Sequence, residues 1–325
     1  MSLIDGFIAR AKETPRRVVL PEGDDPQIVL AACRLAAEGI ARPILLGQPA
    51  AIAALAGGRP LDGIAILDPE EPAAVRQFAA AYAANRDGVS ENMATRLVKR
   101  PLFFAAMMVA EGQADAMVAG ITRPTAQVIS AATLAIGYQA GISQSSSFFL
   151  MVLPGPPERV LVYADAAVVV EPNSAELAGI AVLTARNAQK LLGVEPRVAM
   201  LSFSTRGSAA HPSVDKVREA VALARQMAPD LIIDGEMQAD AALSPRVAAK
   251  KCPDSPLAGA ANVLVFPDLE AGNIAYKLTQ YLAGAQAVGP IMQGFRLPVN
   301  DLSRGASADD IVGVAAIASL QVGER

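Results

Sequence analysis

The sequence has few of the residues on which metal sites and disulfide frameworks depend. Its 325 residues include two cysteines, one histidine and no tryptophan. Cys33 and Cys252 are too few for a disulfide framework, and neither stands in a Cys-x-x-Cys or Cys/His spacing. The acids at residues 234–240 have no partner histidine, so we expect no metal site. A reducing cytoplasm is the simplest compartment for such a chain.

Several motifs are absent as well. The chain has no Walker A and no Gly-x-Gly-x-x-Gly pattern, which argues against a P-loop nucleotidase and a Rossmann dinucleotide enzyme. It also has no Gly-x-Ser-x-Gly elbow to support His211 in a Ser-His-Asp triad. No apolar run reaches about 18 residues, and the N-terminus has no basic region before an apolar run. We therefore expect neither a membrane span nor a signal peptide.

Charge is sparse and spread along the chain. The formal net charge is −4, and no long basic run could neutralise a phosphate backbone. We therefore expect neither nucleic acid nor a membrane as a partner.

Small and apolar residues are abundant, and 52% of the chain is hydrophobic. Short β-rich runs alternate with longer Ala-rich segments of helical spacing, which predicts α/β domains with parallel sheets and helices on both faces. The length allows two domains. Residues 17–20 are expected to form a strand, with Asp25 capping the next helix, Pro26 at its first position and Gly39 ending it. Further strands are expected at residues 43–46, 114–119, 159–163, 198–203, 231–233, 262–266 and 287–292, and a domain crossing near residues 154–157.

Two polar loops stand out, and the first of them follows an expected strand end, where open α/β sheets bind ligands. Residues 202–209 offer hydroxyls, a glycine and Arg206, which could hold phosphate, although ordinary turn chemistry explains them equally well. Residues 300–310 place Arg304 among small hydroxyl residues with acids close behind. An arginine held near a carboxylate could bind an anion while the carboxylate accepts a proton.

Helix capping gives a structural explanation for the acids in these loops. Ser307 resembles an N-cap, with Asp309 and Asp310 in the first helical turn. Asp268 and Asn273 could likewise be caps or polar fixtures of a site. Capping and catalysis do not exclude each other, so both interpretations stay open at this point.

Taken together and in order, these segments resemble the phosphate acetyltransferase and phosphate butyryltransferase family. The resemblance runs over nearly the whole chain, and the joint order and spacing of the segments is far more specific than any one of them. Two examples are Ala-Asp-Ala-Met-Val-Ala-Gly at 114–120 and Asn-Asp-Leu-Ser-Arg-Gly at 300–305. The other matching segments are 19–22, 202–209, 234–242, 266–277, 289–291 and 298–299.

The resemblance implies an isocitrate/isopropylmalate-dehydrogenase-like architecture of two α/β/α domains with the active site in a cleft between them. It places the first domain at residues 1–144 plus 295–325 and the second at residues 145–294. The implied reaction is reversible transfer of an acetyl group between coenzyme A and inorganic phosphate, without a covalent acyl-enzyme. No permanently bound cofactor is expected, coenzyme A being a substrate. A cytoplasmic homodimer is implied as well.

Residue roles also follow from the resemblance. Asp310 matches the base that takes the proton from the coenzyme A thiol, Arg304 the substrate-binding arginine, and Ser303 the hydroxyl that stabilises the developing charge. The other residues expected to bind substrate are Ser204, Thr205, Arg206, Gly207, Ser208, Asn300, Arg123, Thr122, Ser130 and Arg86.

Two positions depart from the family pattern. The family typically carries an arginine where this chain has Ala84, with Arg86 two residues away, and another where it has Ser130, with Arg123 earlier in the same segment. The choice between acetyl, butyryl and other short acyl groups therefore stays open.

Two further hypotheses compete with a transferase. A hydroxy-acid dehydrogenase on the same architecture would require clustered metal-binding aspartates and a nicotinamide site, and the aspartates of this chain lack that pattern. A non-catalytic sensor of acyl-CoA or acyl phosphate would explain the altered arginines. The retained Ser303, Arg304 and Asp310 argue against the sensor.

Overall fold

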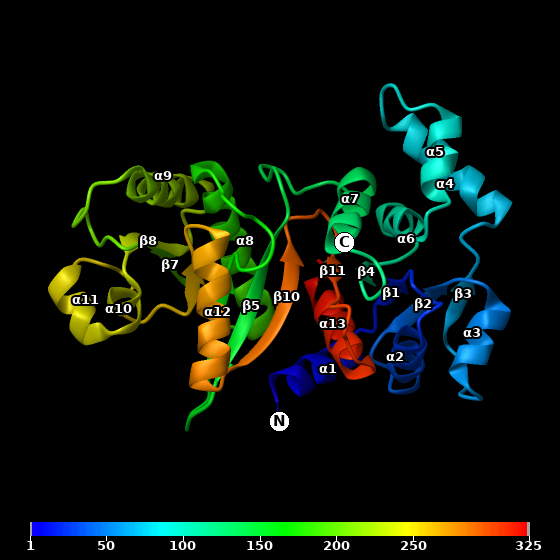
Figure 1. Cartoon of the computed structure of the whole chain (residues 1–325), viewed down its shortest axis with the longest axis horizontal. Helices are drawn as coiled ribbons and strands as arrows, with labels where there is room; N and C mark the ends of the chain where they lie inside the picture. The colour runs from blue at the N-terminus through cyan, green and yellow to red at the C-terminus, as the bar shows by residue number, and fades with distance from the viewer. Residues whose placement is uncertain (1, 324–325) are drawn as a thin grey trace. The chain divides into compact units, whose positions relative to one another are not determined.

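The computed structural model describes residues 2–323 and divides the chain into two compact units. Unit 1 runs to Tyr138 and resumes at Phe295, and unit 2 is Gln139–Gly294. The chain therefore leaves unit 1, builds unit 2 and returns (Figure 1). Residues 139–144 belong to unit 2 in this division.

Unit 1 is built on a parallel five-stranded sheet with strand order β11-β4-β1-β2-β3. Val18, Val19 and Leu20 in β1 are fully buried, as expected for a parallel strand covered on both faces. The order places the ends of β1 and β11 on either side of β4. The strands are β1 Arg17–Leu20, β2 Arg42–Leu46, β3 Ala65–Leu67, β4 Ala116–Ala119 and β11 Val299–Asp301.

Helices cover both faces of this sheet, with α1, α2 and α13 on one side and α6 and α7 on the other (Figure 1). Asp25 caps α2 by accepting from the N–H groups of Gln27 and Ile28, and Pro26 occupies its first position, as predicted. The helices of unit 1 are α1 Leu3–Glu13, α2 Pro26–Ala37, α3 Pro49–Ala56, α4 Pro72–Ala84, α5 Glu91–Val98, α6 Pro101–Ala110, α7 Thr125–Ala135 and α13 Ala308–Gln321.

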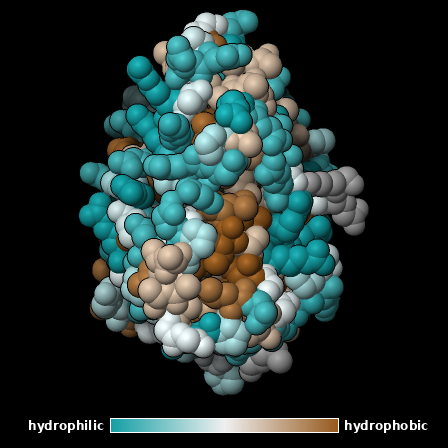
Figure 2. All heavy atoms as spheres, turned by 90° about the vertical axis from the view of Figure 1, so that its right-hand side faces the viewer, coloured by the Kyte–Doolittle hydropathy of each residue, from teal (hydrophilic) through white to brown (hydrophobic). Residues whose placement is uncertain are grey.

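Helix α3 has no polar side chain, so it presents apolar atoms both to the sheet and to its outer face. Figure 2 views the side of the molecule where α3, α4 and α5 lie, and it shows hydrophobic side chains gathered in one area within a hydrophilic surface. Ile52 and Ala56 of α3 are buried, while its other alanines are exposed.

Unit 2 is built on a mixed six-stranded sheet with order β10-β5-β6-β9-β7-β8. The pairs β6–β9, β9–β7 and β7–β8 are parallel. Its strands are β5 Ser146–Leu153, β6 Arg159–Ala164, β7 Arg197–Leu201, β8 Ile232–Met237, β9 Val263–Val265 and β10 Gln286–Gln293. Its helices are α8 Ser174–Leu192, α9 Pro212–Met227, α10 Ala239–Leu243, α11 Pro245–Lys251 and α12 Leu269–Ala283.

The sequence pattern predicted parallel pairing in both domains, and unit 2 departs from it on one side. Strands β5 and β6 are antiparallel, and β10 also runs antiparallel to β5. The Pro-rich turn at residues 154–157 connects β5 to β6 inside unit 2, so no domain crossing lies there. A short turn can join only antiparallel neighbours, because a parallel crossover needs about a dozen residues.

Within residues 2–323, no helix is both long enough and apolar enough to cross a membrane.

Candidate active site

Three connections meet at the carboxyl edge of the unit 1 sheet, the edge at which open α/β sheets bind ligands. Glu22 follows β1, residues 120–123 follow β4, and Asp301 is the last residue of β11. Because β4 lies between β1 and β11, its connection to α7 is flanked by both carboxylates.

Glu22 holds the β4–α7 connection in place. Its carboxylate, only 3% exposed, accepts from the backbone N–H groups of Gly120 (2.7 Å), Ile121 (3.2 Å), Thr122 (2.7 Å) and Arg123 (3.0 Å). The Thr122 hydroxyl adds a fifth bond of 2.6 Å. A buried carboxylate is tolerated only when donors satisfy it, and here every donor comes from the same connection. Thr122 therefore serves the backbone geometry that presents Arg123.

Asp301 is buried on the other side of β4, and its carboxylate accepts fewer hydrogen bonds than that of Glu22. Its Oδ2 accepts from the Thr125 hydroxyl at 2.5 Å, whereas its buried Oδ1 has no hydrogen-bond partner among the described residues. Burial raises the pKa of Asp301 to about 6, and the nearby charge of Glu22 acts in the same direction. Two carboxylates thus flank the β4–α7 connection, and only Glu22 has hydrogen-bond donors for both of its oxygens.

Replacing Gly120 with alanine should disrupt this edge of the sheet. Gly120 has φ +118°, and an added Cβ would lie 2.2 Å from Asp301 Oδ1 and 2.9 Å from the Leu302 backbone nitrogen. We expect Gly120→Ala to lower the free energy of unfolding by about 3 kcal/mol or more, measured by urea unfolding. Gly88 also has positive φ but nothing within 4 Å, so Gly88→Ala should cost about 1–2 kcal/mol. Equal losses would show that Gly120 is needed for backbone conformation alone.

The connection from β11 to α13 exposes a serine and an arginine. Ser303 and Arg304 are exposed, and the Ser303 carbonyl accepts from Ala306 N–H at 3.0 Å to close a turn. In the part of the chain that the structure describes, the guanidinium groups of Arg304 and Arg123 make no hydrogen bond or ion pair. Guanidinium is the side chain best suited to bidentate binding of phosphate oxygens, so both connections can hold anions.

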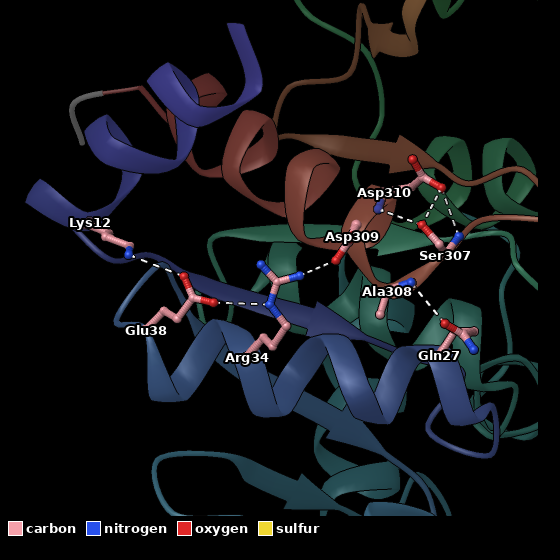
Figure 3. Close-up of polar contacts among 8 residues, drawn as sticks. All are labelled: Lys12, Gln27, Arg34, Glu38, Ser307, Ala308, Asp309 and Asp310. Carbon is pink, nitrogen blue, oxygen red and sulfur yellow. Dashed lines mark hydrogen bonds and ion pairs between the residues drawn. The ribbon is translucent and has the colours of Figure 1, made fainter. Parts of the chain in front are cut away.

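Asp310 lies at the start of α13, where it forms a capping box with Ser307 (Figure 3). Its Oδ2 accepts from the Ser307 N–H at 2.9 Å and the Ser307 hydroxyl at 2.7 Å, and its own N–H donates to Ser307 Oγ at 3.2 Å. Within the described chain its Oδ1 accepts nothing. Capping thus fixes the exposed carboxylate through one oxygen and leaves the other available.

Helix α2 fixes the start of α13 from below (Figure 3). The Ala308 N–H donates to Gln27 Oε1 at 3.0 Å, and Arg34 pairs with the Asp309 carboxylate. Arg34 also bonds Glu38 at 3.1 Å, and it is the main reason that the pKa of Glu38 lies below its usual value. The two adjacent acids therefore differ, because Asp309 has a cationic partner and Asp310 has none within residues 2–323.

A cavity of about 720 Å³ opens at the carboxyl ends of β1 and β2 in unit 1. Its volume lies in the range of small-molecule sites. Its walls are mainly apolar, from residues such as Leu46, Leu97, Phe103, Ala131 and Leu134. The polar side chains on its walls are Glu22, Asp24, Gln48, Arg100, Arg123, Gln127 and Ser130.

The amino-acid sequence is similar to those of known proteins. Residues 2–319 match the family model described as phosphate acetyl/butaryl transferase. The phosphate acetyltransferase of Thermoanaerobacterium thermosaccharolyticum is 46% identical over 326 residues, covering 99% of each chain. The chain belongs to this family.

Solved structures agree with this assignment. A phosphotransacetylase from Streptococcus pyogenes matches with a TM-score of 0.94 and 42% identity over 99% of each chain. A Salmonella typhimurium structure assigned as a 4-hydroxythreonine-4-phosphate dehydrogenase matches at TM-score 0.53 and 13% identity, which shows a shared fold alone. The dehydrogenase-like α/β fold expected from sequence is confirmed, and these comparisons do not favour the dehydrogenase or sensor hypotheses.

The positions that depart from the phosphate acetyl/butyryltransferase pattern have different surroundings. Arg86 donates to the Leu134 carbonyl and lies 5.0 Å from the centre of the Tyr82 ring, so it holds the end of α4 and does not line the cavity. Ser130 and Arg123 both line it. Of the two arginines that we expected near the family anchors, the structure brings only Arg123 to the cavity.

In unit 2, the loop at residues 202–209 uses its donors internally. Glu236 is 2% exposed, and its Oε1 accepts from the Ser204 hydroxyl at 2.8 Å and from Gly207 N–H at 2.7 Å. A buried carboxylate therefore occupies the position at which the sequence suggested that a phosphate could bind. Phosphate binding by this loop stays a prediction, and it would have to displace Glu236.

The remaining residues of that loop are also engaged. Arg206 pairs with the fully buried Asp234 at 2.7 Å, and Arg225 binds its other oxygen at the same distance. Thr205 N–H donates to Ser208 Oγ at 3.0 Å. These bonds join the loop to β8 and α9. Within the described residues, no group of three or more His, Cys, Asp or Glu side chains could hold a metal ion.

Asn300 and two expected caps have structural partners. Asn300 is fully buried in β11 and donates to Gln321 at the end of α13 at 2.7 Å. Asp268 caps α12 by accepting from Ala271 N–H at 2.8 Å, and Asn273 donates to the Ala166 carbonyl at 3.0 Å. Asn300 thus anchors the strand from which Ser303 and Arg304 extend.

Two residues of the site were not predicted. Arg100, at the start of α6, lines the cavity, and its guanidinium has no partner among residues 2–323. A signal was present, since Lys99-Arg100-Pro101 puts a basic pair before a helix that begins with proline. Asp301 lies inside the family-like segment, but no periodicity indicated that this acid is buried.

Proposed function

We propose that this chain catalyses the reaction acetyl-CoA + phosphate = acetyl phosphate + coenzyme A, by direct transfer in a ternary complex. The observation that carries the proposal is on the β11–α13 connection. There, Arg304 and Asp310 both lie exposed, and among residues 2–323 the guanidinium of Arg304 and Oδ1 of Asp310 have no partner. The acyl group is taken from the named activity of the relatives, which are phosphate acetyltransferases.

In the direction of acetyl-CoA formation, Asp310 Oδ1 accepts the thiol proton of coenzyme A. A free thiol has a pKa of about 8.5 and attacks only as the thiolate. An adjacent carboxylate can accept the proton that the thiol must lose. The sulfur then bonds to the carbonyl carbon of acetyl phosphate, and the C=O electron pair moves onto oxygen. When that pair returns, the C–O bond to phosphate breaks. The proton passes from Asp310 to the departing phosphate, which balances the reaction.

Ser303 and Arg304 are proposed to stabilise the charge that develops during this attack. The Ser303 hydroxyl donates to the oxyanion, and the Arg304 guanidinium holds the phosphate oxygens. A well-aimed donor of this kind contributes about 3–4 kcal/mol in other enzymes. In the reverse direction phosphate attacks acetyl-CoA, and protonated Asp310 returns a proton to the leaving thiolate.

The cavity of unit 1 is proposed to take part of coenzyme A. Its apolar walls suit the aliphatic stem of pantetheine, and Arg100 and Arg123 on its walls suit the phosphates. Arg123 is the member of the predicted substrate-binding set that lies both on this wall and on the connection held by Glu22.

Release of free coenzyme A from acetyl-CoA, dependent on added phosphate, tests the proposed function. Propionyl-CoA and butyryl-CoA assayed in parallel would define the acyl preference. Release that requires phosphate and is fastest with acetyl-CoA supports the proposal. Saturable coenzyme A binding without release would overturn it.

We further propose a cytoplasmic homodimer. Both free cysteines are buried, which is compatible with a reducing compartment. Helix α12 carries exposed apolar side chains at Ile274, Leu278, Tyr281 and Leu282, which share one helical face. A two-fold dimer would bring the same face of both copies together and remove this stripe from water.

Changing this stripe should dissociate the dimer. We expect Leu278→Lys to give a monomer by size-exclusion chromatography with light scattering, because a buried unpaired ammonium opposes association. Ala283→Lys, on the opposite face of α12, adds the same charge outside the stripe and should leave the mass unchanged. A dimer that survives Leu278→Lys would place the interface elsewhere.

A further inference from the structure

The two carboxylates that flank the end of β4 are not equivalent. Glu22 accepts five hydrogen bonds from the β4–α7 connection. Asp301 accepts one side-chain bond, from Thr125, and keeps a buried oxygen with no partner in the described chain. Burying a carboxylate with so few donors is unfavourable for folding, so a purely structural explanation for Asp301 is weak.

The position of Asp301 suggests what this arrangement does. Asp301 stands two and three residues before Ser303 and Arg304, and Thr125 stands two residues after Arg123. The bond between Asp301 and Thr125 therefore joins the end of β11, which leads to Arg304, to the start of α7, which follows Arg123. It also joins the segment that carries Asp310 to the wall of the cavity, which includes Arg123.

We propose that Asp301 is a positioning residue for the acyl transfer reaction. Through its bond to Thr125 it fixes the β11–α13 connection, with Ser303 and Arg304, against the β4–α7 connection, with Arg123. This proposal rests on the proposed function, because it takes the anion bound by these connections to be phosphate. Asp301 itself touches no reacting atom in this account and acts through the groups it holds.

Ionisation gives this role a signature that a simple packing residue would lack. Since the pKa of Asp301 is raised in the folded chain, the folded state holds the proton more tightly than the unfolded state does. Stability is therefore lost as the pH rises from about 3.8, where the carboxyl ionises in the unfolded chain, through about 6, and the loss is complete at pH 8. The charged group that acts on Asp301 is Glu22 on the β1–α2 connection. In sequence, Arg304 follows Asp301 by three residues, and Arg123 precedes Thr125 by two.

The variant Asp301→Asn keeps the shape of the side chain and cannot ionise. At pH 8 it should unfold at the same temperature as the wild type or higher, and this advantage should shrink as the pH falls below about 6 and vanish only below about 3.8, where the carboxyl is protonated in the unfolded chain as well. Asp301→Ala, which removes the acceptor of the Thr125 hydroxyl, should lower kcat/KM for phosphate by about 100-fold, the scale of effect expected when catalytic groups are misplaced by about 1 Å.

Thr125→Val removes the hydroxyl that donates to Asp301, so a double variant can test whether the two side chains act through one bond. Thr125→Val and Asp301→Ala should each lower kcat/KM for phosphate, and the double variant should lose no more than the more severe single variant, because both changes remove the same bond. Thr133→Val is the matched control. It lies on the same helix, its hydroxyl bonds Tyr138 at 2.7 Å, and it should leave kcat/KM unchanged.

Stabilisation by inorganic phosphate separates failure of this proposal from failure of the proposed function. Phosphate should raise the unfolding temperature of the wild type and raise that of Asp301→Ala less. If the wild type binds phosphate in this way but releases no coenzyme A, the acyl-transfer function fails, while the positioning of the phosphate-binding connections by Asp301 stands. If Asp301→Ala matches the wild type in both phosphate binding and kcat/KM, or if the double variant's losses add, the positioning role is overturned.

Discussion

Asp310→Asn is expected to lower kcat for coenzyme A release by about 1,000-fold, a typical loss when a general base is removed. The amide cannot accept the thiol proton, but its oxygen can still accept from the N–H and hydroxyl of Ser307, as the carboxylate oxygen does now. The cap therefore survives, and we expect stability to change by less than about 1 kcal/mol. Steady-state kinetics and thermal unfolding of the same preparation measure both quantities.

Asp309→Asn is the matched control for this experiment. Asp309 is adjacent, exposed and likewise in the first turn of α13, but its carboxylate pairs with Arg34 (Figure 3). Losing one exposed ion pair costs about 0–1 kcal/mol, so kcat should stay close to that of the wild type. If the two variants lose the same activity, Asp310 acts through the charge of the helix start and is not the base.

The sequence predicted β1, β2, β4 and α2 of unit 1 because local chemistry decides them, whereas β3 and β11 were not predicted. Asp25, Pro26 and Gly39 mark both ends of α2 by capping and backbone preference, which act within a few residues. The capping box at Ser307 and Asp310 was likewise readable, because its partners are three residues apart. The antiparallel half of unit 2 was not predicted, since strand direction depends on which strands pair.

The candidate site was predicted less completely than the fold. Strand β11 has three residues, too few for periodicity to reveal, and Asp301 becomes buried only because β11 pairs with β4. The sequence separation between Asp301 and Thr125 is 176 residues, so no local pattern could indicate their bond. The same limit applies to Glu236, which takes up the donors of the loop at residues 202–209 from β8.

The family resemblance and the structure identify different features of the candidate site. The resemblance selected Ser303, Arg304 and Asp310, and their roles stay proposals. The structure adds that one oxygen of Asp310 is committed to a cap, and that Arg86 is committed to the Leu134 carbonyl. It also adds Arg100 as a cation on the cavity wall. An anion anchor on this chain is therefore better sought at Arg100 and Arg123 than at Arg86.

Arg304→Ala is expected to lower kcat/KM for phosphate by about 100- to 1,000-fold, the effect of removing one well-aimed donor from a charged transition state. The side chain is exposed and has no partner in the described chain, so its removal leaves no buried group unsatisfied and stability should not change. Arg304→Lys keeps the charge but loses the bidentate fork, and it should recover only part of the loss.

Added guanidinium ion distinguishes a binding role of Arg304 from a general effect of charge. If the guanidinium group itself holds phosphate, millimolar guanidinium should restore part of the activity of Arg304→Ala and none of that of Asp310→Asn. Arg42→Ala is the control, because Arg42 is exposed at the opposite, amino end of β2 and carries the same charge. An equal loss in Arg42→Ala would mean that net positive charge, and not the position of Arg304, attracts the anion.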